Sequence, residues 1–559
     1  MSLRHWLRRQ RSPEIHPDEI FVDSSNLQAF DTDQFEGRIE RPIGQGALLF
    51  VSSLLLLLVG LYCLRAFDLQ FVKGVAYAKQ AAENQLAERI IFADRGTVVD
   101  RTGRELAYNV RVDAESDFAE RHYGQYRGLS HIVGYTKAPT KDSSGHYFRT
   151  SFEGIEGVER AYNDVLAGHN GITLTETDAR GNVVSESAQR PPQTGEQVSL
   201  SLDAEVTQGL YDAIAARAEG SKFQGGAGAV IDIETGELLA LTSYPEYSSE
   251  ALSRGREEAL EAFFADERNP FLNRAISGLY APGSIVKPMV AIAALAEGVI
   301  DEFKEILSTG SISIPNPYFP DQPSIFRDWK AHGYTDMRHA IAVSSDVYFY
   351  TVGGGYKDQQ GLGIATLDEY FKLFGMGNPT GLMGFEEPGG TIPTPEWKEA
   401  TFGGDPWRVG DTYNTAIGQY GVQVTPLQMA RMAAAIANGG MVLTPALIAS
   451  SSPQGTSLPI DPHAFEVARE GMRLAAQGGT AAAVNMPFIE VAGKTGTAQV
   501  GAQNQFMNSW VIGFYPYENP RWAFAVVLER APAGTAVGAP AAMNAFLWWL
   551  KANAPEYLE

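Results

Sequence analysis

The sequence is poor in cysteine, in basic residues and in long apolar runs. Cys63 is the only cysteine among 559 residues, which excludes an intrachain disulfide and a thiolate metal cluster. Lys and Arg number 44 against 66 Asp and Glu, so the net charge of −22 argues against a nucleic-acid-binding surface. No G-x-S-x-G string occurs, so a Ser-His-Asp hydrolase would lack its usual nucleophile turn. What remains is an acidic chain, 44% hydrophobic, long enough for more than one folded unit.

The one long apolar run predicts a membrane anchor. Residues 47–64 read ALLFVSSLLLLLVGLYCL, without a charge, which is enough to cross a hydrocarbon core of about 30 Å. We expect an uncleaved transmembrane segment at 47–66 in contact with membrane lipid, because a long tail precedes it and no A-x-A site follows. Residues 1–46 mix Arg with acidic residues and are interpreted as a solvated cytoplasmic tail. No second span appears, so the rest of the chain lies on one side of the membrane.

Two folded regions are predicted beyond the anchor. FADRGTVVDRTGRELAYN (92–109) alternates around a Thr102-Gly103 turn and predicts a hairpin, and 228–245 repeats this signature around Thr235-Gly236. The Pro- and Gly-containing stretch at 189–197 favours a boundary. We therefore predict a small β-rich module at 67–197 and an α+β domain with an antiparallel sheet at 198–559. In that domain TPLQMARMAAAIAN is expected to be helical and RWAFAVVLER to be a strand.

Three short strings in a fixed order carry the chemistry. APGSIVKP contains Ser284-x-x-Lys287, AVSSDVYFY contains Ser344-x-Asp346, and VAGKTGTAQ contains Lys494, Thr495, Gly496 and Thr497. Alone, Ser-x-x-Lys is a weak signal, because a helix-capping serine with a solvated lysine gives the same pattern. Here it is the only Ser-x-x-Lys in the chain, and the other two strings follow it.

The first string suits a nucleophile and its base at a helix start. Residues i and i+3 share a helical face, so Lys287 can reach the Ser284 hydroxyl and, as a neutral amine, take its proton. Neutrality requires a depressed pKa, which burial and a second cation at Lys494 would supply. Ser344 can relay a proton from an extended loop. For Asp346 a catalytic role and simple hydrogen bonding to backbone remain equally open.

The third string is expected on a strand at the edge of the cleft, where an extended peptide adds alongside. Lys494 and Thr495 can hold a terminal carboxylate, and glycine at 496 lets a ligand backbone approach. The backbone N–H groups of Ser284 and Thr497 can form an oxyanion hole. A phosphate-binding loop ending in Gly-Lys-Thr fails, because its first glycine would fall on Phe488.

A polar cluster precedes Ser344. It admits either a metal site or, as we prefer, solvated loop residues, because cysteine and a standard ligand spacing are missing. Its members are Asp321, Asp328, His332, Asp336 and His339. No metal and no cofactor are therefore predicted.

With these residues in view, the chain resembles the class B penicillin-binding proteins, within them the elongation-type penicillin-binding protein 2. The resemblance covers roughly 66–545. It includes FRDWK (326–330), PTPEWK (393–398), GDTYNTAIGQ (410–419) and TPLQ (425–428). Division-type relatives usually have Asn at the position of Asp346, which favours the elongation type. ADRGTVVDRTG (93–103) and GIEGVERAYNDVLAGHNG (154–171) resemble the family's non-catalytic pedestal, but the head insertion after Asn109 is shortened, so partner contacts through a head become doubtful.

The resemblance implies a penicillin-binding, serine-transpeptidase fold and a peptidoglycan D,D-transpeptidase for cell elongation and shape. Ser284 would attack between two terminal D-alanines of a stem peptide, release the last one, and pass the acyl group to an amine of a neighbouring stem. A β-lactam would acylate the same serine. The implied location is the bacterial inner membrane with the catalytic domain outside the cytoplasm, beside a separate membrane glycan polymerase.

Two other functions stay open. The first is a hydrolase, either a D,D-carboxypeptidase or a β-lactamase, although no Glu-x-x-Leu-Asn string follows Ser344 to supply a deacylating base. The second is a non-catalytic scaffold that binds β-lactams.

Overall fold

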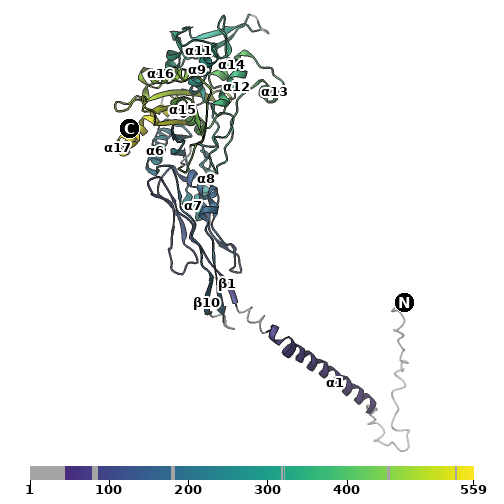
Figure 1. Ribbon diagram of the computed structural model, residues 1–559. Helices are drawn as coiled ribbons and strands as arrows, with labels where there is room; N and C mark the ends of the chain where they lie inside the picture. Colours follow the sequence, from purple (N-terminus) through teal and green to yellow (C-terminus); the bar gives the residue numbers. More distant parts are fainter. Residues whose placement is uncertain are drawn as a thin grey trace, which may run out of the picture. The chain divides into compact units, whose positions relative to one another are not determined.

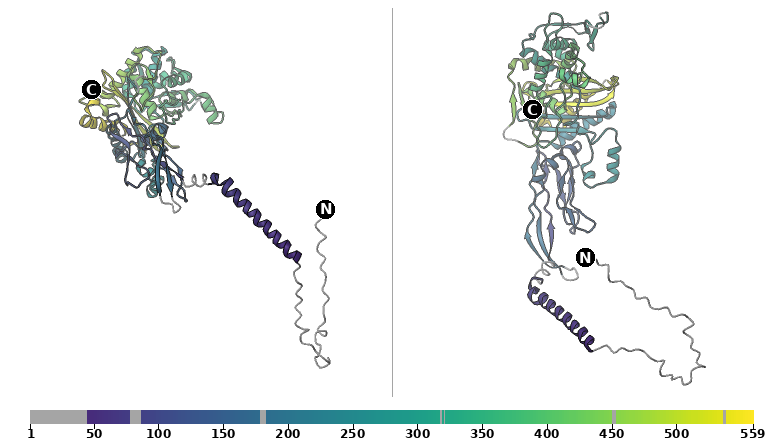
Figure 2. Two further views of the ribbon diagram at one scale, coloured as in Figure 1. Left: turned by 60° about the horizontal axis from the view of Figure 1, so that its bottom comes forward. Right: turned by 90° about the vertical axis from the view of Figure 1, so that its right-hand side faces the viewer.

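The computed structural model describes residues 45–77, 86–177, 183–316, 319, 321–449, 453–535 and 538–559. It divides into two compact units, residues 1–86 with 178–180, and residues 87–177 with 181–559. The tail predicted at 1–46 lies outside the described residues except for its last two. Figures 1 and 2 show the elements of each unit.

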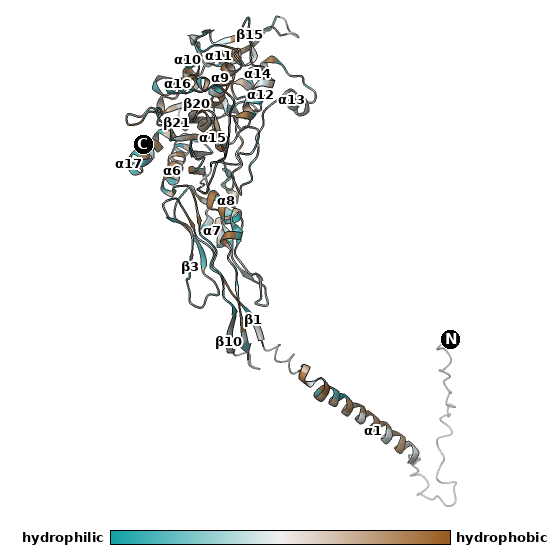
Figure 3. Ribbon diagram, viewed as in Figure 1, coloured by the Kyte–Doolittle hydropathy of each residue, from teal (hydrophilic) through white to brown (hydrophobic). Residues whose placement is uncertain are grey.

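In the described part of the first unit, an apolar helix, α1 (Gln45–Phe67), continues into a π-helical turn (Asp68–Val72). Residues 46–72 form one helix of 27 residues that is long and apolar enough to cross a membrane. Its side chains are exposed, for example Leu56 at 71%, and Figure 3 shows the run of apolar residues along it. Exposed leucines on every side favour lipid over a protein core, in agreement with the anchor predicted at 47–66.

The N-terminal part of the second unit is rich in short strands. One sheet has the order β1-β9-β10 and another the order β11-β2-β3-β4. Their bounds are β1 (Leu86–Ile91), β9 (Gly171–Thr177), β10 (Val183–Arg190), β11 (Val198–Ser199), β2 (Val98–Val99), β3 (Glu105–Val110) and β4 (Glu120–Tyr123). Smaller elements are β5 (Thr136–Lys137), β6 (Thr140–Lys141), β7 (Tyr147–Arg149), β8 (Glu153–Gly154), α3 (Ser130–Val133), α4 (Gly157–Ala161) and α5 (Asn163–Leu166). The antiparallel pairing of β2 with β3 confirms the first predicted hairpin.

A buried ion-pair triad holds this β-rich part together. Glu159 accepts from Arg95 Nε at 2.6 Å and from Arg121 Nε at 2.7 Å, and all three side chains are fully buried. Arg95 comes from the segment between β1 and β2, Arg121 from β4 and Glu159 from α4, so one carboxylate ties three segments together. Removing it would leave two buried guanidinium groups without their anion.

The larger part of the second unit is built on a five-stranded sheet with the order β13-β12-β22-β21-β20. Every neighbouring pair is antiparallel, which confirms the predicted α+β domain. The strands are β13 (Leu238–Tyr244), β12 (Gly225–Asp232), β22 (Trp522–Pro532), β21 (Phe506–Tyr515) and β20 (Ala492–Val500). Because β20 is an edge strand, one side of its backbone is not paired within the sheet.

Both faces of this sheet are covered by helices. Along β22, Phe524, Val526 and Leu528 join the core under α6 (Ala204–Ser221) and α17 (Ala539–Asn553). The alternate residues Ala525 and Val527 join the other core, under α15 (Pro426–Ala437). Because successive side chains of a strand point to opposite faces, β22 contributes to the apolar core on each face of the sheet. α15 begins with a Thr425–Gln428 capping box and confirms the helix expected for TPLQMARMAAAIAN.

The remaining elements complete the second unit. The helices are α7 (Ser249–Ser253), α8 (Glu257–Ala265), α9 (Lys287–Ala296), α10 (Met337–Val343), α11 (Asp346–Gly354), α12 (Gly363–Leu373), α13 (Pro395–Thr401), α14 (Val409–Ala416) and α16 (Pro462–Gly478). The strands are β14 (Ile306–Ser308), β15 (Ser311–Ile314), β16 (Ser324–Arg327), β17 (Gly333–Thr335), β18 (Met441–Leu443) and β19 (Gly455–Ser457). Three 3₁₀ turns are η5 (Gly283–Val286), η6 (Ala482–Val484) and η7 (Pro555–Leu558).

Candidate active site

Ser284 lies in the 3₁₀ turn η5, and α9 begins only at Lys287. The sequence placed both residues on one α-helical start, and the turn keeps them on one face because positions i and i+3 eclipse in a 3₁₀ helix. Ser284 is half-buried, and its hydroxyl forms no hydrogen bond to any residue that the structure describes. It is therefore free to meet a ligand.

Backbone contacts fix the segment that carries Ser284. Gly283 N–H donates to the Gly418 carbonyl at 2.9 Å, and the Trp510 indole N–H donates to the Ala281 carbonyl at 3.0 Å. Gly418 has a φ of +74°, and a Cβ there would lie 2.3 Å from the Gly283 oxygen. The close approach of these two backbones requires glycine at 418.

Ser344 and Asp346 occupy a tight junction between two helices. Ser344 ends α10 in the left-handed region with a φ of 60°, Ser345 caps α11, and Asp346 is the first residue of α11. The prediction of an extended loop at this point is wrong. The left-handed turn, rather than strand-like alternation, turns both side chains towards the cavity described below.

Lys287 is fully buried and uses three hydrogen bonds to hold this junction. Its ammonium donates to Asp346 Oδ1 at 2.7 Å, to the Ser344 carbonyl at 2.8 Å and to Ser344 Oγ at 3.2 Å. Asp346 is thus the ionic partner of Lys287 and not only a backbone acceptor, and its catalytic role stays a prediction.

Lys494 approaches the same hydroxyl from β20. Its amine donates to Ser344 Oγ at 2.8 Å and to the Thr495 carbonyl at 2.9 Å. Burial lowers the pKa of Lys494 well below its usual value, and repulsion from Lys287 lowers it further, while Asp346 opposes both effects. The lowered pKa thus belongs to Lys494, whereas the sequence led us to expect a lowered pKa at Lys287, with Lys494 as the neighbouring cation.

The third string lies on the edge strand, as predicted, with Lys494 paired to Ile512 of β21. Gly496 lines the cavity, and the structure adds a second reason for glycine there besides the ligand approach that the sequence suggested. A Cβ there would meet the protein's own Pro282 carbonyl at 2.7 Å, so glycine lets β20 approach η5. A Cβ on Gly283 would lie 2.8 Å from the Thr497 carbonyl, so the backbones before Ser284 and at Thr497 are neighbours.

A cavity of about 420 Å³ gathers these groups. Its lining comprises Ser284, Trp329, Ser344, Asp346, Thr480, Thr495, Gly496 and Thr497. Lys287 and Lys494 lie buried at its wall through their bonds to Ser344. All eight predicted site residues therefore meet at one place, and their individual roles stay predictions.

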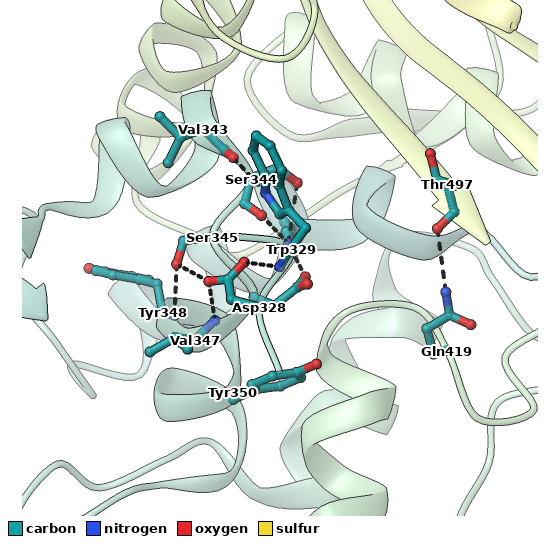
Figure 4. A network of polar contacts seen from close by, with 12 residues as sticks. Asp328, Trp329, Val343, Ser344, Ser345, Val347, Tyr348, Tyr350, Gln419 and Thr497 are labelled. Carbon is teal, nitrogen blue, oxygen red and sulfur yellow. Dashed lines mark hydrogen bonds and ion pairs between the residues drawn. The ribbon is translucent and has the colours of Figure 1, made fainter. Parts of the chain in front are cut away.

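Some residues at this site were not assigned a role from the sequence. Trp329 is 56% exposed, lines the cavity, and donates its indole N–H to the Val343 carbonyl at 3.2 Å. The Gln419 amide donates to the Thr497 carbonyl at 3.4 Å (Figure 4). Both lie in strings noted in the sequence, FRDWK and GDTYNTAIGQ, but a single sequence gives no sign of which members face the cleft.

The polar cluster before Ser344 does not form one site. Asp328 is fully buried and hydrogen-bonded, so its interpretation as a solvated loop residue is wrong. Asp336 caps α10 and contacts His339, whereas His332 lies 3.3 Å from Asp328. Across the described ranges no group of three His, Cys, Asp or Glu side chains is arranged to hold a metal ion.

Comparisons with known proteins agree with this geometry. Residues 226–547 match the family "Penicillin binding protein transpeptidase domain", and residues 112–200 match "Penicillin-binding Protein dimerisation domain". A curated relative from Haemophilus influenzae, "Peptidoglycan D,D-transpeptidase MrdA", is 32% identical over 478 residues, 78% of this chain and 70% of the relative.

Solved structures are also similar. The Helicobacter pylori structure titled "Complex between Penicillin-Binding Protein (PBP2) and MreC" has a TM-score of 0.70 at 26% identity, covering 84% of this chain and 99% of that one. A chain from "Structural coordination of polymerization and crosslinking by a peptidoglycan synthase complex" has a TM-score of 0.69 at 26% identity, covering 90% of this chain and 98% of that one.

Proposed function

The chain belongs to the class B penicillin-binding proteins of the elongation type and is a peptidoglycan D,D-transpeptidase, and on this premise we propose how its residues divide the reaction. The observation that carries the proposal is the position of Ser344 Oγ, which accepts from Lys287 at 3.2 Å and from Lys494 at 2.8 Å. One hydroxyl thus connects two buried amines beside Ser284, so protons can move between the nucleophile and the leaving group without leaving the protein.

Before attack, the two amines exchange a proton. Lys287 is ion-paired with Asp346, while Lys494 has a pKa well below its usual value because it is buried beside another cation. We assign Lys494 the neutral form in the resting site. When substrate fills the cavity, Lys287 passes one proton through the Ser344 hydroxyl to Lys494. Lys287 is then neutral and becomes the base for Ser284.

Attack follows from this arrangement. Ser284 Oγ bonds to the carbonyl carbon between the terminal D-alanines and gives its proton to Lys287. The electron pair of the carbonyl moves to oxygen, which the N–H groups of Ser284 and Thr497 receive as an oxyanion hole. The C–N bond then breaks, and the departing D-alanine amine takes a proton from Ser344, which Lys494 replaces. Lys287 is protonated and Lys494 neutral again, so the cycle closes.

The peptide is held along the edge strand. β20 offers unpaired backbone to an extended stem, and the Thr495 hydroxyl, with Lys494, binds the terminal carboxylate. An amine from a neighbouring stem peptide resolves the ester in the reverse sequence of proton transfers. A β-lactam enters as a mimic of the stem and leaves Ser284 acylated.

Mass spectrometry of the penicillin adduct tests the assignment. The adduct is expected on the peptide that contains Ser284, and Ser284→Ala should remove it. Labelling of that variant at the wild-type rate would move the nucleophile elsewhere, and an unlabelled wild type would favour the scaffold. A stem pentapeptide with an acceptor amine separates transfer from hydrolysis, because cross-linked dimer supports transfer and tetrapeptide alone supports a carboxypeptidase.

We further propose a single-pass inner-membrane protein anchored by 47–66, with a pedestal at 67–197 and the transpeptidase domain at 198–559 outside the cytoplasm. One helix long and apolar enough for a span supports the anchor. Cys63→Ser combined with Glu559→Cys leaves a single thiol at the C-terminus. A membrane-impermeant maleimide should label it in cells with a permeabilised outer envelope, and labelling only after lysis would reverse the orientation.

A separate membrane glycan polymerase is the proposed partner. The similar chain cited above comes from a structure whose title joins polymerization with crosslinking, and another similar structure is a complex with MreC. Residues 67–197 are too few for a fused polymerase domain beside the pedestal. Affinity purification of the full chain in mild detergent should recover a membrane polymerase. Recovery of the chain alone after cross-linking in cells would count against this partner.

A further inference from the structure

Asp328 is a buried carboxylate that the catalytic steps above do not use. It directly follows β16, and its side chain is fully buried. Its Oδ2 atom accepts from Ser345 Oγ at 2.9 Å, from Val347 N–H at 3.0 Å and from Ser308 Oγ at 3.2 Å. Its Oδ1 atom accepts from Trp329 N–H at 2.9 Å. Figure 4 shows this carboxylate at the centre of the network beside Ser344.

In the part of the chain that the structure describes, the carboxylate has neutral donors around it rather than a salt bridge to lysine or arginine. Its charged or titratable contact among the described residues is His332, whose Nε2 lies 3.3 Å from Oδ1. Burial lowers the pKa of His332, although Asp328 itself opposes this, so the imidazole is neutral near pH 7. Burying a carboxylate costs free energy unless hydrogen-bond donors replace its water. The neutral donors around Asp328 and the N–H groups at the start of α11 offset that cost.

The contacts of residues 328–329 reach both sides of Ser344. Trp329 Nε1–H donates to the carbonyl of Val343, which precedes Ser344. Asp328 accepts from Ser345 and Val347, which follow Ser344. Ser344 itself is in the left-handed conformation, which is strained for a residue with a side chain. The turn is therefore held on each side by a neighbouring segment.

We propose that Asp328 is a positioning residue for acylation, which fixes the 343–347 turn so that Ser344 Oγ stays between the two lysine amines. It acts through Ser345 and Val347 and does not touch substrate. The inference rests on the proposed role of Ser344 in proton transfer. A displaced Ser344 would slow proton transfer but would leave the carboxylate-binding residues on β20 in place.

The test compares Asp328→Asn with wild type in the detergent-solubilised full chain. Asparagine keeps the shape but turns one acceptor oxygen into an NH₂ group that faces donors. Rapid-quench labelling with a fluorescent penicillin over a range of concentrations separates the non-covalent dissociation constant from the acylation rate constant. The rate constant refers only to molecules that become labelled, so a smaller folded fraction does not change it.

The acylation rate constant of Asp328→Asn is expected to fall at least about 30-fold, since misplacement by an ångström can cost 10²-fold, while the dissociation constant changes less than about threefold. Ser345→Ala removes one donor to the carboxylate and should lower the rate constant roughly three- to tenfold. The matched control is Asp100→Asn, a fully buried carboxylate that accepts four hydrogen bonds in the β2–β3 hairpin and its surroundings. It should reduce stability and leave acylation unchanged.

The results discriminate as follows. Acylation of Asp328→Asn within threefold of a normally labelled wild type would overturn the positioning role. If that variant yields no labelled protein, Ser345→Ala decides alone, and a wild-type rate constant for it would overturn the role. A wild type that is not labelled at Ser284 would instead disprove the proposed function.

Discussion

Substituting Gly418 should slow acylation although this residue lies outside the three catalytic strings. A Cβ at 418 would lie 2.3 Å from the Gly283 oxygen and 2.8 Å from its nitrogen, whereas an ordinary contact begins near 3.4 Å. To restore an ordinary contact from 2.3 Å, the backbone next to Ser284 must move by about 1 Å. A shift of that size can lower a catalytic rate about 10²-fold. The positive φ of 74° adds about 1–2 kcal/mol of strain.

Gly439→Ala separates strain from displacement. Gly439 has a φ of +79°, and nothing lies within 4 Å of a Cβ built there, so alanine adds the conformational strain without a clash. Penicillin acylation and thermal unfolding of both variants give the comparison. Both should lose thermal stability, but only Gly418→Ala should lose about two orders of magnitude in acylation rate. Equal acylation rates for the two variants would refute the argument that Gly418 sets the place of Ser284.

Three further variants test other parts of the structure. Lys494→Met should flatten the pH dependence of the free energy of unfolding. Because the folded-state pKa of Lys494 lies below the unfolded value of 10.5, wild type gains up to about 1.4 kcal/mol of stability per pH unit as the pH rises between the two values. Denaturant titrations in which the unfolding free energies of both proteins change equally with pH would contradict this. Glu159→Gln should cost about 3–5 kcal/mol in chemical unfolding, because two buried arginines lose their anion, while labelled molecules acylate normally; an unfolding midpoint near wild type would exclude that role. Trp329→Ala should weaken non-covalent penicillin binding by about tenfold at most, since an aromatic contact contributes about 0.5–1.5 kcal/mol, and should also lower the acylation rate constant, because it removes the hydrogen bond to the Val343 carbonyl; a wild-type dissociation constant would argue against a ligand contact at this indole.

The parts of the fold that follow from local pattern were predictable. Alternation around the two Thr-Gly turns gave both hairpins, and the helical period of TPLQMARMAAAIAN gave α15. The order of strings along the chain predicted a shared site, because a family resemblance supplied the three-dimensional arrangement that spacing alone does not contain.

The errors arose where tertiary contacts decide local conformation. Ser344 adopts a left-handed turn because neighbouring segments hold it, and no turn signal such as glycine marks the position. Asp328 lies in a polar stretch that reads as loop, yet donors from β14 and from the start of α11 bury it. At Gly496 the sequence suggested ligand approach, which stays a prediction because this residue lines the cavity, but it gave no sign that η5, more than 200 residues earlier in the chain, also lies against it.

The two lysine contacts also limit the kind of hydrogen bond that the Ser344 hydroxyl can form with a ligand. An alcohol oxygen has two lone pairs, and both are occupied by N–H groups from Lys287 and Lys494. In the resting site its own hydrogen is therefore left to point towards the open cavity, where Ser344 forms part of the lining, and it turns towards Lys494 only when a proton is relayed. A molecule bound there is met by a donor, so the site favours ligands that place an acceptor opposite Ser344 and disfavours those that place an N–H or O–H there.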